Sequence, residues 1–292
     1  MKIYTRCIPC FARQAVDAAE MATGDTGLQE LIIRSALRKI AEADYVKTPP
    51  HIGVLIHGVV KSLVGDIDPY QGLKSLYNRL ALEHYPYMKK LVAGASSPLE
   101  TAAKLAVAGN NIDFGIRGRH ERIGIRDVVE ETLAMPFSID DFPEFAQALS
   151  GNGSILYAAD NAGEIVFDRL LIEQIPDFRR RVTVAVKGGP ILNDATREDA
   201  EAAGLTTLVR VVDTGHDAPG IIYEQCSSSF RETLDRSGLV ISKGQGNYET
   251  LSECGNRVFF LLKAKCPVIA RDLGVEVGDI VLKGSTPVSV DA

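Results

Sequence analysis

The sequence predicts an α/β fold in which a helical N-terminal part is followed by a mostly parallel sheet with helices on both faces. Residues 1 to about 150 carry runs rich in Ala, Leu and Glu, with apolar residues three or four positions apart, which is typical of helices. From residue 154 onward, short β-branched runs alternate with helical ones, as in parallel sheets. Between these parts, residues 136–154 hold two prolines and then Gly151, Asn152 and Gly153, which predicts a boundary near residue 150.

The two predicted domains therefore span residues 1–150 and 151–292. In the first domain the clearest helical runs are residues 9–22, 28–43 and 98–109. Gly24 and Gly109 stand where helices could end, because glycine readily adopts the conformation found at helix C-termini. No alternation of apolar and polar residues predicts a strand before residue 150.

The second domain is predicted from alternating strands and helices. Strands are predicted at residues 154–160, 181–187, 207–213, 239–244 and 257–265. Helices are predicted at residues 162–175 and 196–204, the latter with Thr196 as N-cap and Asp199 three residues later in a capping-box pattern. Right-handed crossovers between such strands produce a mostly parallel sheet.

Composition limits the possible functions. Of the 292 residues, 46% are apolar and 24% are charged, so the chain can bury a sizeable core. A net charge of −6 and a pI near 5.5 argue against bulk binding to nucleic acid or anionic membranes, but not against a small anionic ligand. The chain has no apolar leader and no run of the roughly 20 apolar residues that a membrane helix needs. With five cysteines, an odd number, we expect reduced thiols and a cytoplasmic location; the oligomeric state is not indicated.

Polar side chains follow four of the predicted strands at the point where each strand ends. They are Asp160, Asn161 and Glu164; Lys187, Asn193 and Asp194; Asp213, His216 and Asp217; and Lys243, Asn247 and Glu249. Because ligands bind beyond the carboxyl ends of strands in open parallel sheets, we expect these residues to share one edge. Asn110, Asn111 and Asp113 could reach the same cleft, although this stretch could equally form a helix end and turn.

Asp160, Asn161 and Asp194 form the candidate metal site. Their carboxylate and amide oxygens suit Mg²⁺ or Mn²⁺ better than a metal that prefers thiolates. Neighbouring strands lie about 5 Å apart, so Asp160 and Asp194 could share one ion despite their separation in the sequence. The helix predicted from Ala162 would begin at this site, and its free N–H groups would favour a phosphate oxygen there.

Several of these patterns also have purely structural interpretations. Asp160 could cap the helix that follows it, and Asn193 with Asp194 could form a turn and a cap. The segment Lys243-Gly-Gln-Gly is a weak glycine-rich signal, because it lacks the third glycine of a dinucleotide fingerprint and the spacing of a Walker A loop.

A C-x-x-C pair lies at the N-terminus, where its spacing favours a structural role. The pair formed by Cys7 and Cys10 cannot by itself complete a tetrahedral zinc site. Nor does it follow a predicted strand, as a thioredoxin-like motif would. Cys266 could join the pair in space, but the sequence leaves this open.

Together these motifs resemble the damage-control phosphatases, a family formerly of unknown function, and specifically its subfamily I. The subfamily's three motifs correspond to Cys7 and Cys10, to Gly246, Asn247, Tyr248 and Glu249 as a GNFE-like motif with Tyr for Phe, and to Lys265 and Cys266. The wider family signature corresponds to the segment from Asp160 to Glu164 and to Asp194. The resemblance extends over the whole chain in length and order.

This resemblance implies a helical part packed on a three-layer α/β/α domain with a Rossmann-like sheet. It also implies a divalent metal, typically Mn²⁺, Ni²⁺, Co²⁺ or Mg²⁺, at Asp160, Asn161 and Asp194. The implied activity is hydrolysis of phosphate monoesters, such as damaged or surplus sugar phosphates or nucleotides. Composition and spacing alone indicate only an edge of the sheet that could bind a hard metal and an anion.

For catalysis we expect Asp160, Glu164 and Lys243 to be central. Lys243 would bind one phosphate oxygen as a point charge, and backbone N–H groups near Ala162 and Gly163 would bind another. A polarised water is favoured over Asp160 as the nucleophile, because a carboxylate committed to a metal attacks poorly. Further substrate contacts are expected from Asn110, Asp113, Asp213 and Asn247.

Other functions are also compatible with these residues. One is a nucleotide- or cofactor-binding protein without catalysis, and another is a Rossmann-like methyl- or glycosyltransferase. Both predict tight binding of a nucleotide or donor cofactor. A purely structural protein would show no stabilisation by metal.

Overall fold

A computed structural model describes residues 1–111, 124–255 and 258–285, and a seven-stranded sheet forms its centre. The strand order is β1-β7-β6-β5-β2-β3-β4. The strands are β1 (Ile139–Asp140), β2 (Ile155–Ala158), β3 (Val182–Val186), β4 (Arg210–Asp213), β5 (Leu239–Lys243), β6 (Val258–Lys263) and β7 (Ile280–Gly284). All five strands that the sequence predicts are therefore confirmed, within a few residues at their ends.

The sheet is mostly parallel, as predicted. β2 pairs in parallel with both β3 and β5, with Tyr157 opposite Val184 on one side and Ile241 on the other. β4 and β6 extend this parallel arrangement outward. β7 runs antiparallel to β6, and β1 pairs with β7 at the edge. These last two strands were not predicted, and β1 lies before residue 150.

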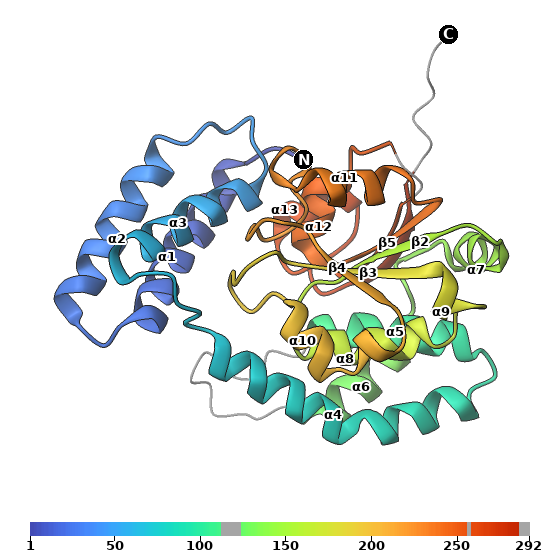
Figure 1. Cartoon of the computed structure of the whole chain (residues 1–292). Coiled ribbons are helices and arrows are strands. Elements are labelled where there is room, and N and C mark those ends of the chain that lie inside the picture. The colour runs from blue at the N-terminus through green and yellow to red at the C-terminus, as the bar shows by residue number, and fades with distance from the viewer. Residues whose placement is uncertain (112–123, 256–257, 286–292) are drawn as a thin grey trace, which may run out of the picture.

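The first three helices form a unit of their own. α1 (Ile8–Ala22), α2 (Thr26–Ala41) and α3 (Pro49–Val64) lie to one side of the sheet in Figure 1. Their apolar faces bury one another around Phe11, Ile32 and Ile56. The short 3₁₀ helix η1 (Thr5–Cys7) leads into α1.

This unit docks on the α/β part through few contacts. The terminal amine of Met1 donates to the backbone oxygen of Glu249 over 2.8 Å. Lys61 of α3 forms an ion pair with Asp217. Gly53 of α3 lies so close to Pro219 that a Cβ at this position would be 2.6 Å from the proline ring.

Helices cover both faces of the sheet. One face packs against α4 (Gln71–Gly94), α5 (Pro98–Asn111), α6 (Ile125–Ala134) and α8 (Glu164–Ile172), which lie together below the sheet in Figure 1. The other face packs against α11 (Ser228–Asp235), α12 (Gly244–Leu251) and α13 (Pro267–Leu273). The remaining helices are α7 (Phe142–Ser150), α9 (Phe178–Arg181), α10 (Arg197–Ala202), η2 (Leu205–Thr207) and η3 (Tyr223–Gln225). This is the expected three-layer arrangement.

The hydrophobic cores do not follow the boundary predicted near residue 150. α4, α5 and α6 precede that position, yet they share one core with strands of the sheet and with Phe167 of α8. A separate core contains only residues up to and including Val64. The physical reason is that α5 is apolar on the side that faces the sheet, so it must be buried there. The cores therefore divide the chain near residue 65.

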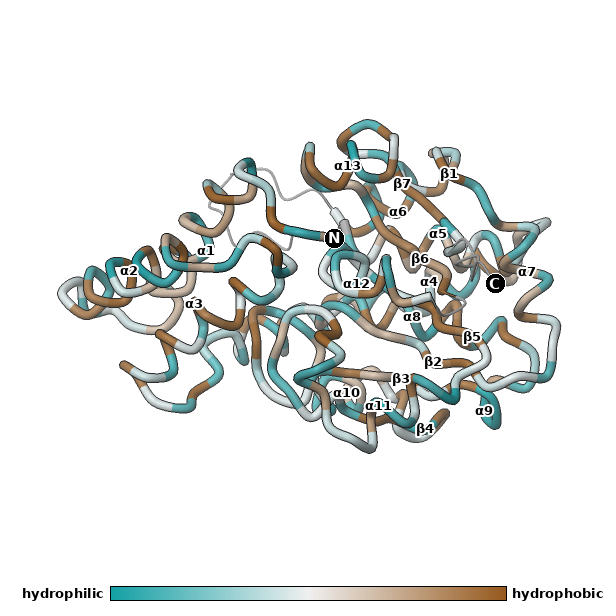
Figure 2. Tube along the Cα trace, turned by 90° about the horizontal axis from the view of Figure 1, so that it is seen from above, coloured by the Kyte–Doolittle hydropathy of each residue, from teal (hydrophilic) through white to brown (hydrophobic). Residues whose placement is uncertain are grey.

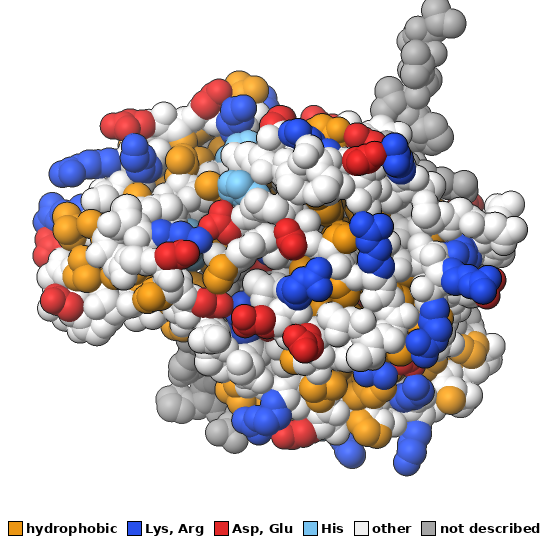
Figure 3. Space-filling view, viewed as in Figure 1, with side chains coloured by type: hydrophobic (Ala, Val, Ile, Leu, Met, Phe, Trp, Pro, Cys, Tyr) orange, Lys and Arg blue, Asp and Glu red, His pale blue; other side chains and the backbone are white. Residues whose placement is uncertain are grey.

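Hydropathy and charge follow this layering. In Figure 2 the central strands β5, β6 and β7 are hydrophobic, whereas the outer helices alternate between hydrophobic and hydrophilic residues. Figure 3 shows acidic and basic side chains interspersed over the face that it displays. Within the described ranges, no helix combines the length and the apolar character needed to cross a bilayer.

Candidate active site

Asp160 stands at the point where the order of the strands changes direction. From β2 the chain passes to β3 and β4 on one side and then returns to β5 on the other, so a crevice opens beyond β2. Asp160 follows β2, and Gly244 begins α12 next to it. A Cβ at Gly244 would lie 1.8 Å from Oδ2 of Asp160, and the φ of +76° also favours glycine. The site therefore requires a glycine here for the carboxylate to approach.

Backbone hydrogen bonds join the loop after β2 to the loop after β3. Ala195 donates to the oxygen of Asp160, and Ala162 donates to the oxygen of Asn193, each over 2.8 Å. An isolated antiparallel bridge pairs Asn161 with Asp194. The structure thus brings the three predicted metal ligands side by side.

Two asparagines hold the carboxylates of this site. The Nδ2 atom of Asn110 donates to Asp160 Oδ2 over 2.9 Å and to Glu164 Oε2 over 2.8 Å. Nδ2 of Asn161 donates to the same two oxygens over 2.8 and 3.1 Å. Asn110 therefore lies beside Asp160 and Glu164, where its amide nitrogen donates to their carboxylates, and its role as a substrate contact stays a prediction.

Burial makes these carboxylates unusually basic. Desolvation, followed by the charge of Glu164, raises the pKa of Asp160 to about 6. Desolvation also raises the pKa of Asp194 to about 7, against the opposing effect of Lys187. Lys187 Nζ is 3.4 Å from Asp194 Oδ2 and 3.3 Å from Asn247 Oδ1. A cation placed between Asp160 and Asp194 would relieve this cost.

Lys243 does not reach the cleft, contrary to prediction. Its side chain is 0% exposed, and its ammonium donates over 2.6 Å to both Glu164 and Asp168 and over 2.8 Å to the oxygen of Ala106. Burial alone would lower the pKa of Lys243, but Asp168 and Glu164 raise it above its usual range. With all three N–H groups used inside the protein, Lys243 positions carboxylates and does not contact a phosphate.

Glu164 is likewise committed within the site. One carboxylate oxygen accepts from Lys243, and the other accepts from Asn110 and Asn161. Its side chain is 1% exposed. This arrangement gives Glu164 a positioning role in place of the predicted catalytic one.

The predicted anion contacts of the backbone are also occupied. The N–H group of Ala162 donates to Asn193, and the N–H group of Gly163 donates to Oδ1 of Asn78 over 2.7 Å. Helix α8 begins at Glu164, two residues later than predicted, with Gly163 at a φ of +76°. The helix N-terminus is therefore buried against α4 and is not free for a phosphate.

Two further predicted substrate contacts lie elsewhere. Asp213 is exposed at the end of β4, where its carboxylate accepts from Gly215 N over 3.0 Å and stabilises a turn. Asn247 is fully buried and donates to the backbone oxygens of Lys243 and Ala159. Asp113 falls outside the described residues.

A cleft of about 880 Å³ opens above this site. Asn110 and Asn161 lie on its floor. One wall comes from α1, including Cys10 and Arg13, and another from Lys263 and Lys265 at the end of β6. Aromatic and apolar side chains complete the lining, among them Met21, Tyr70, Tyr77, Leu192 and Val277. The cleft thus lies between the N-terminal helical unit and the carboxyl edge of the sheet.

The donor set fits a hard divalent cation. Within the described residues, no three His, Cys, Asp or Glu side chains are arranged to hold a metal ion. A cation would therefore use the two carboxylates, the amide oxygen of Asn161 and oxygens from water or substrate, as Mg²⁺ and Mn²⁺ commonly do. Oδ1 of Asn110 is buried without a hydrogen-bond partner among the described residues, and Oδ2 of Asp194 has only the 3.4 Å ion pair with Lys187, so both oxygens could accept a further partner.

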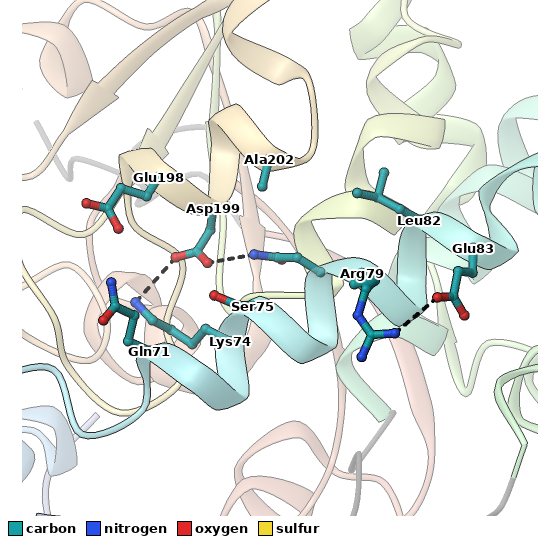
Figure 4. A pocket seen from close by; sticks show the side chains of 10 residues that line it. Gln71, Lys74, Ser75, Arg79, Leu82, Glu83, Glu198, Asp199 and Ala202 are labelled. Carbon is teal, nitrogen blue, oxygen red and sulfur yellow. Dashed lines mark hydrogen bonds and ion pairs between the residues drawn. The ribbon is translucent and has the colours of Figure 1, made fainter.

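A second pocket contains a residue that holds the site loop in place. It measures about 510 Å³ and lies between α4 and α10. In Figure 4, Lys74 and Asp199 point toward one another, and their ion pair measures 3.4 Å. Asn78 donates to Asp199 over 2.7 Å and also holds Gly163 of the site loop. Asp199 in turn caps α10 with Thr196, which confirms the predicted capping box.

The motif residues near the cleft have structural partners. The hydroxyl of Tyr248, which replaces the phenylalanine of the motif, donates to Asp272 over 2.7 Å. Cys7 and Cys10 are free thiols at the start of α1. Burial raises the pKa of Cys7, and the charges of Glu249, Cys266 and Cys10 add to this rise.

Three residues that hold this site together were not assigned a role from the sequence. Lys187 was expected at this edge, because it follows a predicted strand just as Lys243 does, but it received no role. Asp168 lies four residues after Glu164 on the same face of α8, which is a signal that helical spacing provides. Asn78 carries no sequence signal, since its partners lie 85 and 121 residues away.

Comparison with known proteins places the chain in a family. Residues 3–281 match the family described as the Damage-control phosphatase ARMT1-like domain. A protein described as a damage-control phosphatase from Archaeoglobus fulgidus is 35% identical, and the alignment covers 97% of this chain and 99% of that protein. Another damage-control phosphatase, from Pyrococcus horikoshii, is 37% identical over 96% of this chain and 97% of its own length.

Two further similarities extend over nearly the whole chain. An uncharacterized protein from Methanocaldococcus jannaschii is 37% identical over 97% of this chain and 95% of its own length. The crystal structure of a DUF89 family protein from Pyrococcus horikoshii superposes with a TM-score of 0.89 at 36% identity. It covers 98% of this chain and 100% of that chain, so the arrangement of the helical unit and the sheet is shared.

Proposed function

Because the chain belongs to the ARMT1-like damage-control phosphatase family, we propose that it hydrolyses phosphate monoesters of small metabolites with the help of a divalent metal ion. The observation that carries this proposal is the pair of buried carboxylates, Asp160 and Asp194, which flank Asn161 next to the cleft that Asn161 lines. The substrates are damaged or surplus sugar phosphates or nucleotides, and the metal is Mn²⁺ or Ni²⁺, with Co²⁺ and Mg²⁺ as alternatives.

Asp160, Asn161 and Asp194 would hold the metal. When bound, such an ion polarises a phosphate oxygen and offsets negative charge in the transition state. Asn110 and Asn161 fix the orientation of the Asp160 carboxylate through its Oδ2 atom. Behind them, Lys243 fixes Glu164, so the carboxylates are held in place before substrate binds.

Lys265 takes the phosphate-binding role that the sequence assigned to Lys243. Its side chain lines the cleft and is exposed. Its charge offsets part of the rise that burial causes in the pKa of Asp160, so the ammonium lies near that carboxylate. An ammonium in this position would bind a phosphate oxygen as a compact point charge.

Water is the proposed nucleophile. Asp160 Oδ2 already accepts hydrogen bonds from two amides and is packed against Gly244. A carboxylate held in this way has little freedom to attack phosphorus. Trapping a phosphorylated Asp160 in a single turnover would contradict this step.

Hydrolysis of p-nitrophenyl phosphate tests the proposal. We expect activity to disappear after EDTA treatment and to return with Mn²⁺ or Ni²⁺. The isosteric variant Asp194→Asn should lose at least about 100-fold in rate, because it removes one of two anionic ligands. Its thermal stability without metal should be lower, because the buried ammonium of Lys187 loses the carboxylate 3.4 Å away, so rates are compared at a temperature where both proteins are folded.

Asp213→Asn is the matched control. It removes the same charge from the neighbouring strand end, but the side chain there is exposed and lies outside the cleft. This variant should keep wild-type activity and wild-type stabilisation by Mn²⁺. Metal-independent hydrolysis by the wild type, or full activity of Asp194→Asn at saturating Mn²⁺, would overturn the proposal.

A further inference from the structure

Among the charged side chains that line the cleft, the basic ones, Arg13, Lys263 and Lys265, outnumber the acidic one, Asp17. Lys263 and Lys265 both line the cleft, and neither ammonium has a hydrogen bond or an ion pair within the part of the chain that the structure describes. Across from them, Arg13 of α1 is 59% exposed and approaches Asp17 only at 4.0 Å. Exposed lysines are usually just solvated, but here three cations from two separate elements face one cavity.

Lys263 and Lys265 project to the same side of the chain. Successive side chains of an extended segment point in opposite directions, so residues two positions apart share a side. Between them, Ala264 is 0% exposed and points into the core. The segment therefore turns both lysines toward the cleft.

The spacing of these lysines suits two anionic groups better than one. Two residues along an extended segment span about 6.6 Å, which exceeds the separation of oxygens within a single phosphate. Lys265 lines the same cleft as Asn161, one of the proposed metal ligands, and is the candidate partner of the reactive phosphate. Lys263 and Arg13 remain available for a different group on the same ligand.

The cleft also has room for such a ligand. Its volume of about 880 Å³ is near the upper end of the range for small-molecule sites, so it can hold far more than one phosphate. Tyr70, Tyr77 and Met21 supply an apolar surface for the organic part between the two charged ends.

We propose that the cleft recognises a phosphate monoester that carries a second anionic group, either another phosphate or a carboxylate, which Arg13 and Lys263 bind. This inference rests on the proposed phosphatase function and narrows its substrate class. The reactive phosphate lies near Asp160 and Lys265, and the second anion lies between α1 and the end of β6.

Kinetics on matched substrates test this inference. With Mn²⁺ present, kcat/KM should be about 10-fold or more higher for a hexose bisphosphate or a phosphoglycerate than for a hexose monophosphate. A larger value for the bisphosphate identifies a second phosphate, and a larger value for the phosphoglycerate identifies a carboxylate. Arg13→Glu and Lys263→Glu should each remove this preference, because they should raise KM for the substrates with two anions more than they lower kcat/KM for p-nitrophenyl phosphate.

Lys90→Glu is the charge-matched control, because Lys90 is exposed on α4 outside the cleft. It should keep the full preference. Thermal shifts give a comparison without turnover: propane-1,3-bisphosphonate should stabilise the wild type more than propylphosphonate, and Arg13→Glu should abolish the difference. Equal kcat/KM for substrates with one and two anions, or an equal loss on all substrates in the variants, would overturn the inference. Failure to hydrolyse p-nitrophenyl phosphate would instead overturn the proposed function, and the phosphonate comparison would still stand.

Discussion

The buried ammonium of Lys243 determines how the acidic side chains of the site are arranged. It binds Glu164 and Asp168 at 2.6 Å each, and Tyr157 adds a hydrogen bond to Asp168 over 2.8 Å. Removing one partner from such a buried network leaves charges uncompensated and typically costs about 3–5 kcal/mol. The network therefore holds Glu164, and through the asparagines it also holds Asp160.

Glu249 leads to a prediction about pH. Burial raises the pKa of this carboxyl from 4.5 to about 7. Between pH 4.5 and about 7, the folded state keeps a proton on Glu249 that the unfolded state has released. The group therefore favours folding at low pH, and this contribution is lost as pH rises to about 7. Relative to wild type, Glu249→Gln should gain up to about 3 kcal/mol in unfolding free energy across this window.

Urea unfolding at pH values on both sides of the window measures this difference. The amide keeps an oxygen that can accept from Gln245 Nε2, which now lies 3.1 Å from Glu249 Oε1, so the comparison isolates the titration. A difference between variant and wild type that does not change with pH would show that Glu249 titrates normally in the folded protein.

At the scale of single residues, the sequence predicted where residues lie in the fold better than where their side chains point. Asp160, Asn161 and Asp194 were expected together because parallel strands end at one edge, and the structure brings them side by side. Lys243 also ends a strand, but its side chain runs under the sheet toward α5 and α8. Whether a long side chain points toward solvent or core depends on packing partners far away in the sequence.

At the scale of elements, the turn between β5 and α12 is the most constrained junction. Gly244 has a φ of +76°, and a Cβ there would overlap the carboxylate of Asp160. Gly274, after α13, has the same φ of +76° but no atom within 4 Å of its would-be Cβ. The two glycines share the same positive φ, but only Gly244 lies against the side chain of another residue.

Substituting each glycine with alanine should separate these two effects. Gly274→Ala should lose only the backbone contribution, about 1 kcal/mol of unfolding free energy. Gly244→Ala should lose more, and it should also lose stabilisation by Mn²⁺, because Asp160 must move. Thermal melts with and without Mn²⁺ measure both quantities. Equal metal-linked stabilisation in the two variants would show that the position of Asp160 is not critical.

Elements with a strong local sequence pattern were predicted, and elements with a weak pattern were missed. The β-branched run of β3 and the apolar runs of β2, β5 and β6 were recognised from sequence. β1 contains only Ile139 and Asp140, which is too short for any periodicity. It forms because β7 offers a free edge, which is a tertiary effect.

At the scale of the whole molecule, the chain has two sets of cores with the cleft between them. Helical periodicity identified the helices before residue 150, but it could not show which surface each one covers. α2 packs with α1 and α3, whereas α5 packs with α8 and the sheet. The division of the chain thus depends on long-range contacts that a local pattern does not contain.

This division predicts unequal local stability. The unit of α1 to α3 has a small core and few contacts with the rest, so it should open at a lower free energy than the sheet. Native-state hydrogen exchange in increasing urea would show amides of α2 losing protection before those of β2 and β5. α5 is the internal control, because it also precedes residue 150 but shares the core of the sheet, so it should lose protection together with β5. If α2 and α5 lost protection together and before β5, residues 1–150 would behave as one cooperative unit, and the boundary would lie where the sequence first placed it.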